Sequence, residues 1–172
     1  MIDVWFSIGS NIEPRFKYIS HAKNLLSEIC RIEKISKVFE TKPWGMPEGT
    51  PPFLNLAIKG VIEHELSPLD LLNKCKTIET SLGRKHNVQK SRTIESRTID
   101  IDIILFDDVI LKTDKLTIPH PSCHKRAFVV IPILSTGEDP YHPILKKRFS
   151  ELLREIEKEE ISGVIETSLK IC

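Results

Sequence analysis

The most constraining feature of this chain is a short alternation of isoleucine and aspartate over residues 99–103. Successive side chains of a β-strand point to opposite faces, so a strand here places the three isoleucines on one face and Asp100 and Asp102 on the other. Aspartate is depleted in strands, and two nearby carboxylates repel each other unless a cation is present. Two residues of strand span roughly 6.5–7 Å and paired magnesium ions lie about 3.5–4 Å apart, so the two carboxylates fit a metal pair. The alternation therefore predicts a magnesium site on a strand; the alternative is a half-exposed strand whose aspartates face water.

Basic segments flank this strand on both sides. From Arg84 to Arg97 the chain has six Arg, Lys or His side chains against the single acid Glu95. After the strand, polar and basic side chains gather around a Pro-His-Pro turn: Lys115, Thr117, His120 and Arg126. A polyphosphate needs cationic partners as well as metal, so these segments favour a polyphosphate site over the alternative of solvated charged loops. No GxxxxGK[ST] loop and no GxGxxG after a strand is present, so ATP would be bound without either common phosphate-binding loop.

The overall composition limits the classes of partner. Twenty-five Lys and Arg against twenty-four Asp and Glu leave a net charge of +1, which predicts neither a nucleic-acid nor a membrane partner. The longest apolar stretch, Ala127–Leu134, is too short to span a bilayer, and Met1–Ile8 lacks the basic start of a secretory signal. The cysteines lack metal-ligand or redox spacing, so we expect reduced, inert thiols in a cytoplasmic protein: Cys30, Cys75, Cys123 and Cys172.

Hydrophobic periodicity predicts the elements of the fold. Strands are expected over residues 3–8, 32–39, 53–62 and 99–106, with shorter ones at 109–111, 116–118, 128–131 and 162–171. Helices are expected over residues 12–29, 67–83 and 147–159. Asn11 is the expected cap of the first helix, and Ser67-Pro68 followed by Asp70 is the expected start of the second.

The order strand, helix, strand, strand, helix, strand is typical of an α+β, ferredoxin-like split βαβ sandwich. Its antiparallel sheet packs two helices on one face and leaves the other for a ligand or for added elements. Residues 41–52 are rich in Pro and Gly and residues 84–97 are polar and basic, so both segments are predicted loops. Without an internal repeat or a linker, we expect a single domain over residues 1–172 with extra C-terminal elements.

Seven short motifs follow one another between about residue 4 and residue 134. They are SIGSN at 7–11, ETKPWG at 40–45, FLN at 53–55, IETSLGR at 78–84, RTIDIDIILF at 97–106, LTIPHP at 116–121 and RAFVVIPI at 126–133. With these motifs the chain resembles the 6-hydroxymethyl-7,8-dihydropterin pyrophosphokinases of the folate pathway. The resemblance implies a monomeric, ferredoxin-like enzyme. It also implies magnesium-dependent transfer of the pyrophosphate of ATP to the pterin hydroxymethyl group, with release of AMP.

The resemblance also implies roles for individual residues. Asp100 and Asp102 would hold two Mg²⁺ ions and act in catalysis with Arg84 and Arg97. The pterin site would be formed by Thr41, Pro43, Trp44, Phe53, Asn55 and Phe128, with the two phenylalanines stacking on the ring and Asn55 bonding its edge. The nucleotide site would be formed by Lys76, Glu79, Arg84, Arg97, Ile103, Lys115, Thr117, His120 and Arg126. The two long loops would close over the substrates as lids.

The sequence departs from the family pattern around the second loop. Glu95-Ser96 stands where Gly-Pro is common, Lys85-His86 where a second Arg follows, and Lys76 where a Gln is found. The only tryptophans are Trp5 and Trp44, so the loop before the two aspartates has none. These differences concern the cover over ATP rather than the two aspartates.

Three alternatives stay open. A non-catalytic nucleotide-binding module of the same fold would be free to lose Asp100, Asp102, Asn55 and His120, which are all present. An RNA-binding ferredoxin-like domain predicts exposed aromatic side chains on central strands and a basic face, but the RNP1 pattern is absent and the charge is balanced. A metal phosphohydrolase built on the same aspartates would need more clustered His or Asp ligands than this sequence contains.

Overall fold

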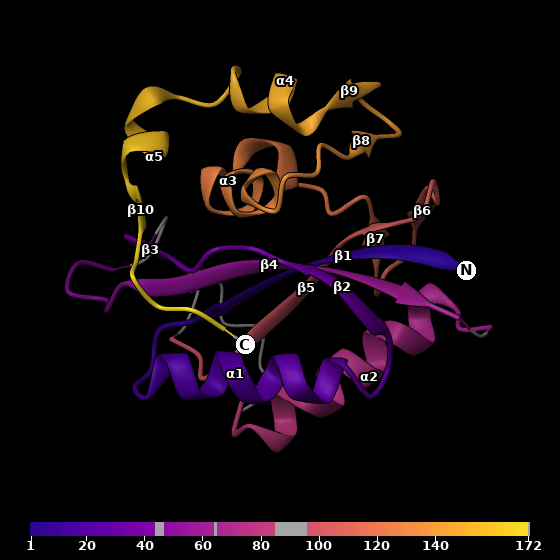
Figure 1. Cartoon of the computed structure of the whole chain (residues 1–172), viewed down its shortest axis with the longest axis horizontal. Helices are drawn as coiled ribbons and strands as arrows, with labels where there is room; N and C mark the ends of the chain where they lie inside the picture. The colour runs from indigo at the N-terminus through magenta and orange to yellow at the C-terminus, as the bar shows by residue number, and fades with distance from the viewer. Residues whose placement is uncertain (44–46, 64, 85–95, 172) are drawn as a thin grey trace.

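The computed structural model describes residues 1–43, 47–63, 65–84 and 96–171 and shows an antiparallel sheet between two layers of helices (Figure 1). The first elements are β1 (Ile2–Ser10), α1 (Arg15–Leu26), β2 (Arg31–Ile35), β3 (Phe39–Thr41), β4 (Phe53–Ile62), α2 (Pro68–Ser81) and β5 (Asp100–Phe106). The later elements are β6 (Leu111–Lys112), β7 (Thr117–Ile118), the 3-10 helix η1 (Cys123–Lys125), α3 (Ala127–Ser135), β8 (Tyr141–His142), β9 (Lys147–Arg148), α4 (Phe149–Leu153), α5 (Lys158–Ser162) and β10 (Val164–Glu166). The α+β class and the antiparallel sheet are therefore confirmed. None of the helices in these ranges has the length and apolar character needed to cross a bilayer.

Strand β4 lies at the centre of the sheet, whose order is β10-β3-β4-β1-β5 with β2 also paired to β4. All of these pairings are antiparallel. The register aligns neighbouring residues across the strands: Thr41 with Phe53, Gly9 with Asn55 and with Asp100, and Ser7 with Asp102. Directly opposed residues project to the same face, so one face of the sheet collects these side chains.

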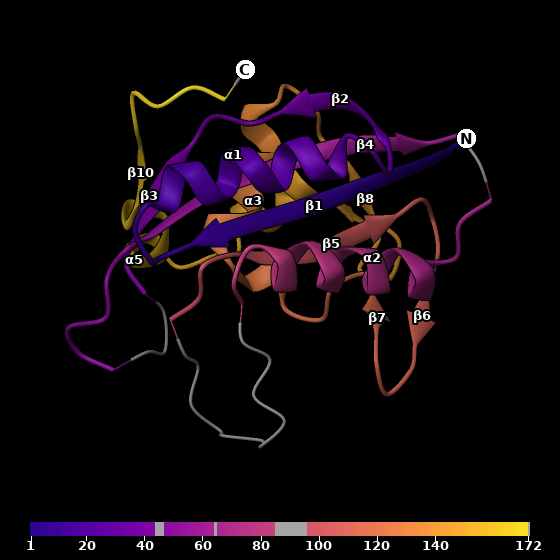
Figure 2. The ribbon, with the colours of Figure 1, turned by 90° about the horizontal axis from the view of Figure 1, so that it is seen from below.

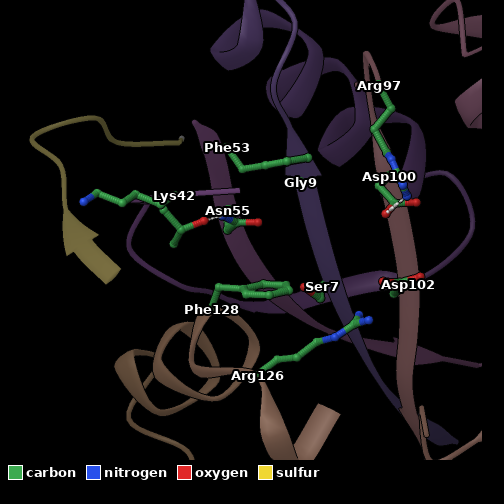
Figure 3. Close-up of a pocket in the computed structure, with 11 residues that line it drawn as sticks. Ser7, Gly9, Lys42, Phe53, Asn55, Arg97, Asp100, Asp102, Arg126 and Phe128 are labelled. Atoms are coloured by element: carbon green, nitrogen blue, oxygen red, sulfur yellow. Dashed lines mark hydrogen bonds and ion pairs between the residues drawn. The ribbon is translucent and has the colours of Figure 1, made fainter. Parts of the chain in front are cut away.

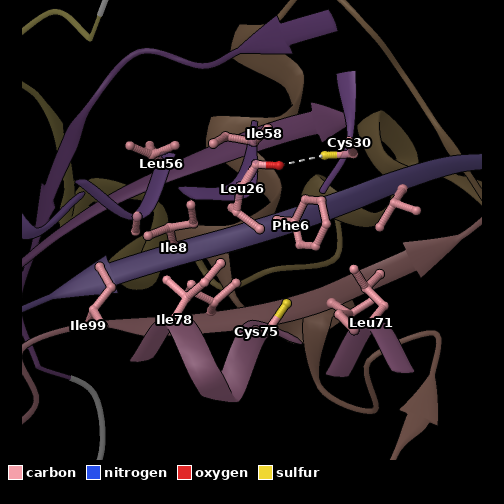
Figure 4. Packing of buried hydrophobic residues seen from close by; sticks show 14 of the residues in the cluster. Phe6, Ile8, Leu26, Cys30, Leu56, Ile58, Leu71, Cys75, Ile78 and Ile99 are labelled. Carbon is pink, nitrogen blue, oxygen red and sulfur yellow. Dashed lines mark hydrogen bonds between the residues drawn. The ribbon is translucent and has the colours of Figure 1, made fainter. Parts of the chain in front are cut away.

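The opposite face of the sheet packs on α1 and α2, which lie on either side of β1 when seen from below (Figure 2). Val4, Phe6 and Ile8 alternate along β1 and are fully buried, where they belong to the same cluster as Leu26 of α1 and Ile78 of α2 (Figure 4). Burying each large apolar side chain is worth about 1.5–3 kcal/mol, so this layer stabilises the sheet that carries the polar side chains on its opposite face.

Gly60 of β4 lies where a side chain has no room. A Cβ at this position would sit 2.5 Å from Sγ of the buried Cys30 and 3.6 Å from the ring of Phe6. We expect Gly60→Ala to lower the free energy of unfolding by about 1–3 kcal/mol, because overpacking forces neighbours to move. Urea unfolding measures this loss. The double variant with Cys30→Ala should recover part of it, and strictly additive losses would contradict the contact.

The second layer of helices covers the face of the sheet that carries Ser7, Asn55 and the two aspartates of β5. Helix α3 buries Ala127, Val129 and Ile133 against this face, beside Trp5 and Leu105 of the sheet. The strand predicted at residues 128–131 is therefore wrong. Its run of Phe, Val and Ile has the composition of a strand, but packing against the sheet decides for a helix. The prediction that the second face receives added elements is confirmed.

Several predicted boundaries also need correction. The helix predicted at 147–159 is two short helices, α4 and α5. The first starts only at Phe149, because residues 147–148 pair as β9 and the Glu151 carboxylate accepts the Arg148 backbone N–H at the start of α4. The strand predicted at 162–171 is only β10, and the one at 32–39 is divided into β2 and β3. Helix α2 starts as predicted, since Oγ of Ser67 accepts the backbone N–H of Asp70. Helix α1 begins at Arg15 without a side-chain cap, so the capping role of Asn11 is wrong.

Candidate active site

A cavity of about 230 Å³ opens on the polar face of the sheet (Figure 3). It is lined from β1, β3, β4, β5 and the start of α3 by Ser7, Gly9, Thr41, Lys42, Phe53, Asn55, Arg97, Asp100, Asp102, Arg126 and Phe128. The predicted face separation on β5 is confirmed, since Ile101 and Ile103 are buried while Asp100 and Asp102 border the cavity. The two carboxylates therefore lie on one wall of a shared space.

Asp100 is held by two guanidinium groups in this structure. Nη1 of Arg84 donates to Oδ1 at 2.5 Å, and Nη1 of Arg97 donates to Oδ2 at 2.6 Å. Arg84 also contacts the buried carboxylate of Glu79, which in turn accepts the backbone N–H of Ile101 at 2.8 Å. Burial raises the pKa of Glu79, although the charge of Arg84 and the N–H of Ile101 act against the shift. Through Arg84, the end of α2 is thereby connected to Asp100, the first carboxylate of β5.

Asp102 lies two residues further along the same face of β5. Burial, followed by the charge of Asp100, raises the pKa of Asp102 well above its ordinary value, although Arg126 acts in the opposite direction. A carboxyl group whose pKa is raised in the folded state costs stability as the pH rises above its unfolded pKa, because the fold must give up a proton that it binds more tightly. The environment of Asp102 thus favours the binding of a cation beside its carboxylate.

We expect Asp102→Asn to stabilise the metal-free protein at pH 8. The expected gain is about 1 kcal/mol, kept small because about a third of the Asp102 side chain meets solvent. Near pH 4 the carboxyl group is protonated in the fold, so the gain should largely disappear. Urea unfolding in EDTA at the two pH values measures the difference, and an equal gain at both would contradict the assignment.

His120 and Arg126 approach Asp102 from the other side. Burial lowers the pKa of His120 to about 4, and the charge of Arg126 adds to the effect. The ring is therefore neutral near pH 7. Its Nδ1 accepts the backbone N–H of Ser122 at 3.3 Å, which leaves the proton on Nε2, 4.0 Å from Oδ2 of Asp102. The buried Nε of Arg126 has no hydrogen-bond partner in the described structure, so this side offers donors to an anion.

The other half of the cavity is aromatic and has no carboxylate among its lining residues. Phe53 and Phe128 lie on opposite sides of Asn55, with their rings seen edge-on in Figure 3. Nδ2 of the buried Asn55 donates to Oγ1 of Thr41 at 2.7 Å, which fixes the amide and leaves Oδ1 as an acceptor. The guanidinium of Arg126 lies 5.6 Å from the centre of the Phe128 ring. This half suits a flat ligand with hydrogen-bonding groups on its edge.

A family profile described as 7,8-dihydro-6-hydroxymethylpterin-pyrophosphokinase (HPPK) matches residues 5–137. The chain belongs to this pyrophosphokinase family. It is 40% identical over 151 residues to the 2-amino-4-hydroxy-6-hydroxymethyldihydropteridine pyrophosphokinase of Aquifex aeolicus. The matched region covers 88% of this chain and 90% of that protein. The protein of the same name from Haemophilus influenzae is 33% identical over 141 residues, or 81% of this chain and 84% of that protein.

Solved structures of the pyrophosphokinase family share the fold. The Plasmodium falciparum HPPK-DHPS structure with SDX-DHP has a TM-score of 0.67 at 15% identity. The match covers 90% of this chain and 44% of that longer chain, so this chain spans less than half of the solved one. The resemblance drawn from the seven motifs is confirmed at the level of the family.

Not all residues expected from the pyrophosphokinase resemblance meet in the cavity. Pro43 lines an adjoining cavity with Phe128. Lys76 is exposed on α2, Lys115 is exposed beside β7, and Thr117 is half-buried on β7. The Ile103 side chain is buried on the α1 and α2 side, so only its backbone is available to a ligand. Trp44, the 85–95 part of the basic loop and Cys172 lie outside the described residues.

The motif comparison assigned no role to four residues of the site. Ser7, Gly9 and Lys42 line the cavity. The alternation of β1 could have placed Ser7 and Gly9, because Val4, Phe6 and Ile8 occupy the opposite face. Asn11 does not cap a helix; its Oδ1 accepts the backbone N–H of Arg97 at 2.8 Å. Asn11 thus positions Arg97 across 86 residues of sequence, which no local pattern reveals.

Proposed function

We propose that this chain catalyses magnesium-dependent transfer of the β,γ-pyrophosphate of ATP to the hydroxyl of 6-hydroxymethyl-7,8-dihydropterin, with release of AMP, in folate biosynthesis. The observation that carries the proposal is one cavity with two different halves. An aromatic half with a fixed amide suits the pterin ring, and a half with two carboxylates and two guanidinium groups suits a metal-bound polyphosphate. The names of the relatives that match over most of their length support the same activity.

The two carboxylates fit Mg²⁺. Asp100 and Asp102 offer hard oxygen ligands from one strand face, and Mg²⁺ completes such a set with water and phosphate oxygens. Burial, followed by the charge of Asp100, raises the pKa of Asp102, and a bound cation would offset both effects. We infer that the pair holds two ions. When bound, they would neutralise charge on the phosphate oxygens.

The cationic side chains supply the rest of the charge. In the ATP complex we expect Arg84 and Arg97 to exchange Asp100 for phosphate oxygens, because Asp100 would then hold a metal ion. Arg126 and the Nε2–H of His120 reach the phosphates from the opposite side. We keep Lys76, Glu79, Ile103, Lys115 and Thr117 as proposed contributors to the nucleotide site.

The reaction then depends on how the protein orients the two substrates, rather than on a protein nucleophile. The pterin hydroxyl oxygen forms a bond to the β-phosphorus and releases its proton to solvent. The bond from that phosphorus to the α,β-bridging oxygen breaks, and AMP leaves with this oxygen. Phe53 and Phe128 hold the ring, while Asn55 and Thr41 fix its rotation. No side chain is assigned as a general base, because orientation and charge neutralisation supply most of the rate in such transfers.

Gly9 gives a test of the pterin half. A Cβ at this position would lie 3.0 Å from Oδ1 of Asn55 and 3.5 Å from the ring of Phe53. We expect Gly9→Ala to raise the KM for the pterin about tenfold, because a small misplacement of the amide weakens its bonds. Initial-rate kinetics measure the change. Ser10→Ala removes a buried hydroxyl without a partner in the described structure and is the control; an equal effect in both variants would contradict this role for Gly9.

The product distinguishes this function from its alternatives. Purified protein is incubated with ATP and 6-hydroxymethyl-7,8-dihydropterin, with Mg²⁺ or with EDTA, and nucleotides are separated by chromatography. We expect AMP in amounts equal to the pterin consumed, and only with Mg²⁺. Formation of ADP would overturn pyrophosphate transfer, and nucleotide binding without turnover would favour the non-catalytic nucleotide-binding module.

The number of metal ions has its own measurement. Mn²⁺ binding is followed by electron paramagnetic resonance in the presence of the pterin and an ATP analogue that cannot be cleaved. We expect two bound Mn²⁺ ions per chain, and a smaller number in the Asp102→Asn variant. A single ion would contradict the paired site.

We further propose that residues 1–172 act as one ferredoxin-like domain, monomeric and cytoplasmic, with small molecules rather than nucleic acid or membrane as partners. The near-balanced charge supports the last point. Light scattering after size-exclusion chromatography tests the monomer, and a mass of twice 19.7 kDa would contradict it.

A further inference from the structure

A second cluster of ligand-type side chains lies outside the cavity. Cys123 and His124 belong to η1, and His142 lies on β8, in the layer above the sheet (Figure 1). One sulfur and two imidazole nitrogens from these residues lie within 4.8 Å of one another. None of the three lines the cavity.

Two of the three residues are buried, His124 is half-buried, and one of its nitrogens has no hydrogen-bond partner in the described structure. The Cys123 thiol is fully buried and free, and His142 is only 4% exposed. Nδ1 of His124 is buried without a hydrogen-bond partner in the described structure. A buried nitrogen that loses water without gaining a partner destabilises the fold, so its presence calls for an explanation. A ligand that accepts this lone pair would supply one.

The surroundings hold the imidazole rings in place. The His142 ring stacks on Phe149 with an interplanar angle of 29° and meets the His124 ring edge-on at a centroid distance of 6.0 Å. Nδ1 of His142 accepts the backbone N–H of Leu145 at 3.2 Å. Rings that are already oriented lose little freedom on binding, which favours a metal site.

We propose that Cys123, His124 and His142 bind a thiophilic divalent ion of the Zn²⁺ class. One thiolate and two imidazoles are a donor set that Zn²⁺ accepts, with a fourth position for water, whereas Mg²⁺ prefers oxygen. Binding releases the Cys123 thiol proton to solvent and involves no change of oxidation state. The site would join η1, which lies between His120 and Arg126, to the β8–β9 hairpin.

Two structural adjustments accompany binding. Tetrahedral coordination brings donor atoms to about 3.3–3.6 Å from one another, so the cluster must contract by about 1 Å. His142 must also give up the bond from Leu145, since a metal-bound ring needs its other nitrogen protonated. At 3.2 Å this bond is long, and its loss is a small cost beside a new metal–nitrogen bond.

Cobalt(II) is the probe, because thiolate ligation gives it a charge-transfer band in the near ultraviolet. The full chain with Cys172→Ser, reduced and metal-free, is titrated with Co²⁺ in the absence of ATP. We expect the band and tetrahedral visible bands to saturate at one equivalent, with Zn²⁺ displacing the cobalt. No thiolate band in the folded protein would overturn the proposal.

Variants locate the ligands. Cys123→Ser should abolish the band and His142→Gln should weaken Co²⁺ binding at least tenfold. Cys30→Ala, which removes a buried thiol from the other core, and Asp102→Asn should both keep it. A band that survives Cys123→Ser would refute the site.

X-ray absorption on the unsubstituted chain with one Zn²⁺ gives an answer even where a variant fails to fold. One sulfur and two imidazoles in the first shell are expected, and a shell of oxygen alone would overturn the site. None of these readouts uses pyrophosphate transfer, so the two proposals fail independently.

Discussion

Replacing Asp100 or Asp102 by asparagine is expected to lower kcat for AMP formation by at least about a thousandfold. Each variant removes a charged oxygen ligand where two metal ions and a triphosphate must be held together, and loss of such charge stabilisation costs several kcal/mol in the transition state. Initial rates with saturating ATP, pterin and Mg²⁺ measure the loss.

Asp108→Asn is the matched control. Asp108 follows the same strand, but its side chain is exposed beyond the end of β5 and it does not line the cavity. Its kcat should remain within twofold of the parent value. Full activity in Asp100→Asn or Asp102→Asn, with the fold verified by circular dichroism, would refute the metal assignment.

Asn55→Leu is expected to raise the KM for the pterin by about 100- to 1,000-fold. Asn55 is buried, and its amide is fixed by Thr41, so leucine of similar size would leave the polar edge of the ring without partners. Affinity for an uncleavable ATP analogue, measured by calorimetry, should stay within about twofold, since the amide lies in the aromatic half.

The variant Thr41→Val tests how much the orientation of the Asn55 amide contributes, because Asn55 itself stays in place to contact the substrate. This variant removes only the acceptor for Nδ2 of Asn55, so an increase in KM of about tenfold is expected. An unchanged KM in Asn55→Leu, or an equal loss of ATP affinity, would contradict the division of the cavity into two halves.

Local patterns were enough to predict several features. The face separation on β5 depends only on the two-residue period of a strand. The start of α2 depends on Ser67, Pro68 and Asp70, which lie within four residues of one another. Features of this kind need no knowledge of the rest of the chain, and the structure confirms both.

Features set by distant contacts could not be predicted from local patterns. The apolar run of α3 has strand composition, and only the sheet beneath it selects a helix. Asn11 has the sequence context of a helix cap, but it holds the backbone of Arg97 from the other side of the site. The cysteines lack metal-ligand spacing, and Cys123 meets His142 only because β8 folds back over η1.

The fate of each phosphate tests the central claim most directly. The protein is supplied with Mg²⁺, 6-hydroxymethyl-7,8-dihydropterin and ATP labelled in separate reactions at the α-, β- or γ-phosphate. We expect the α label to remain in AMP and the β and γ labels both to appear in the pterin product in equal amounts. Retention of the β label in ADP, with only the γ label on the pterin, would contradict it.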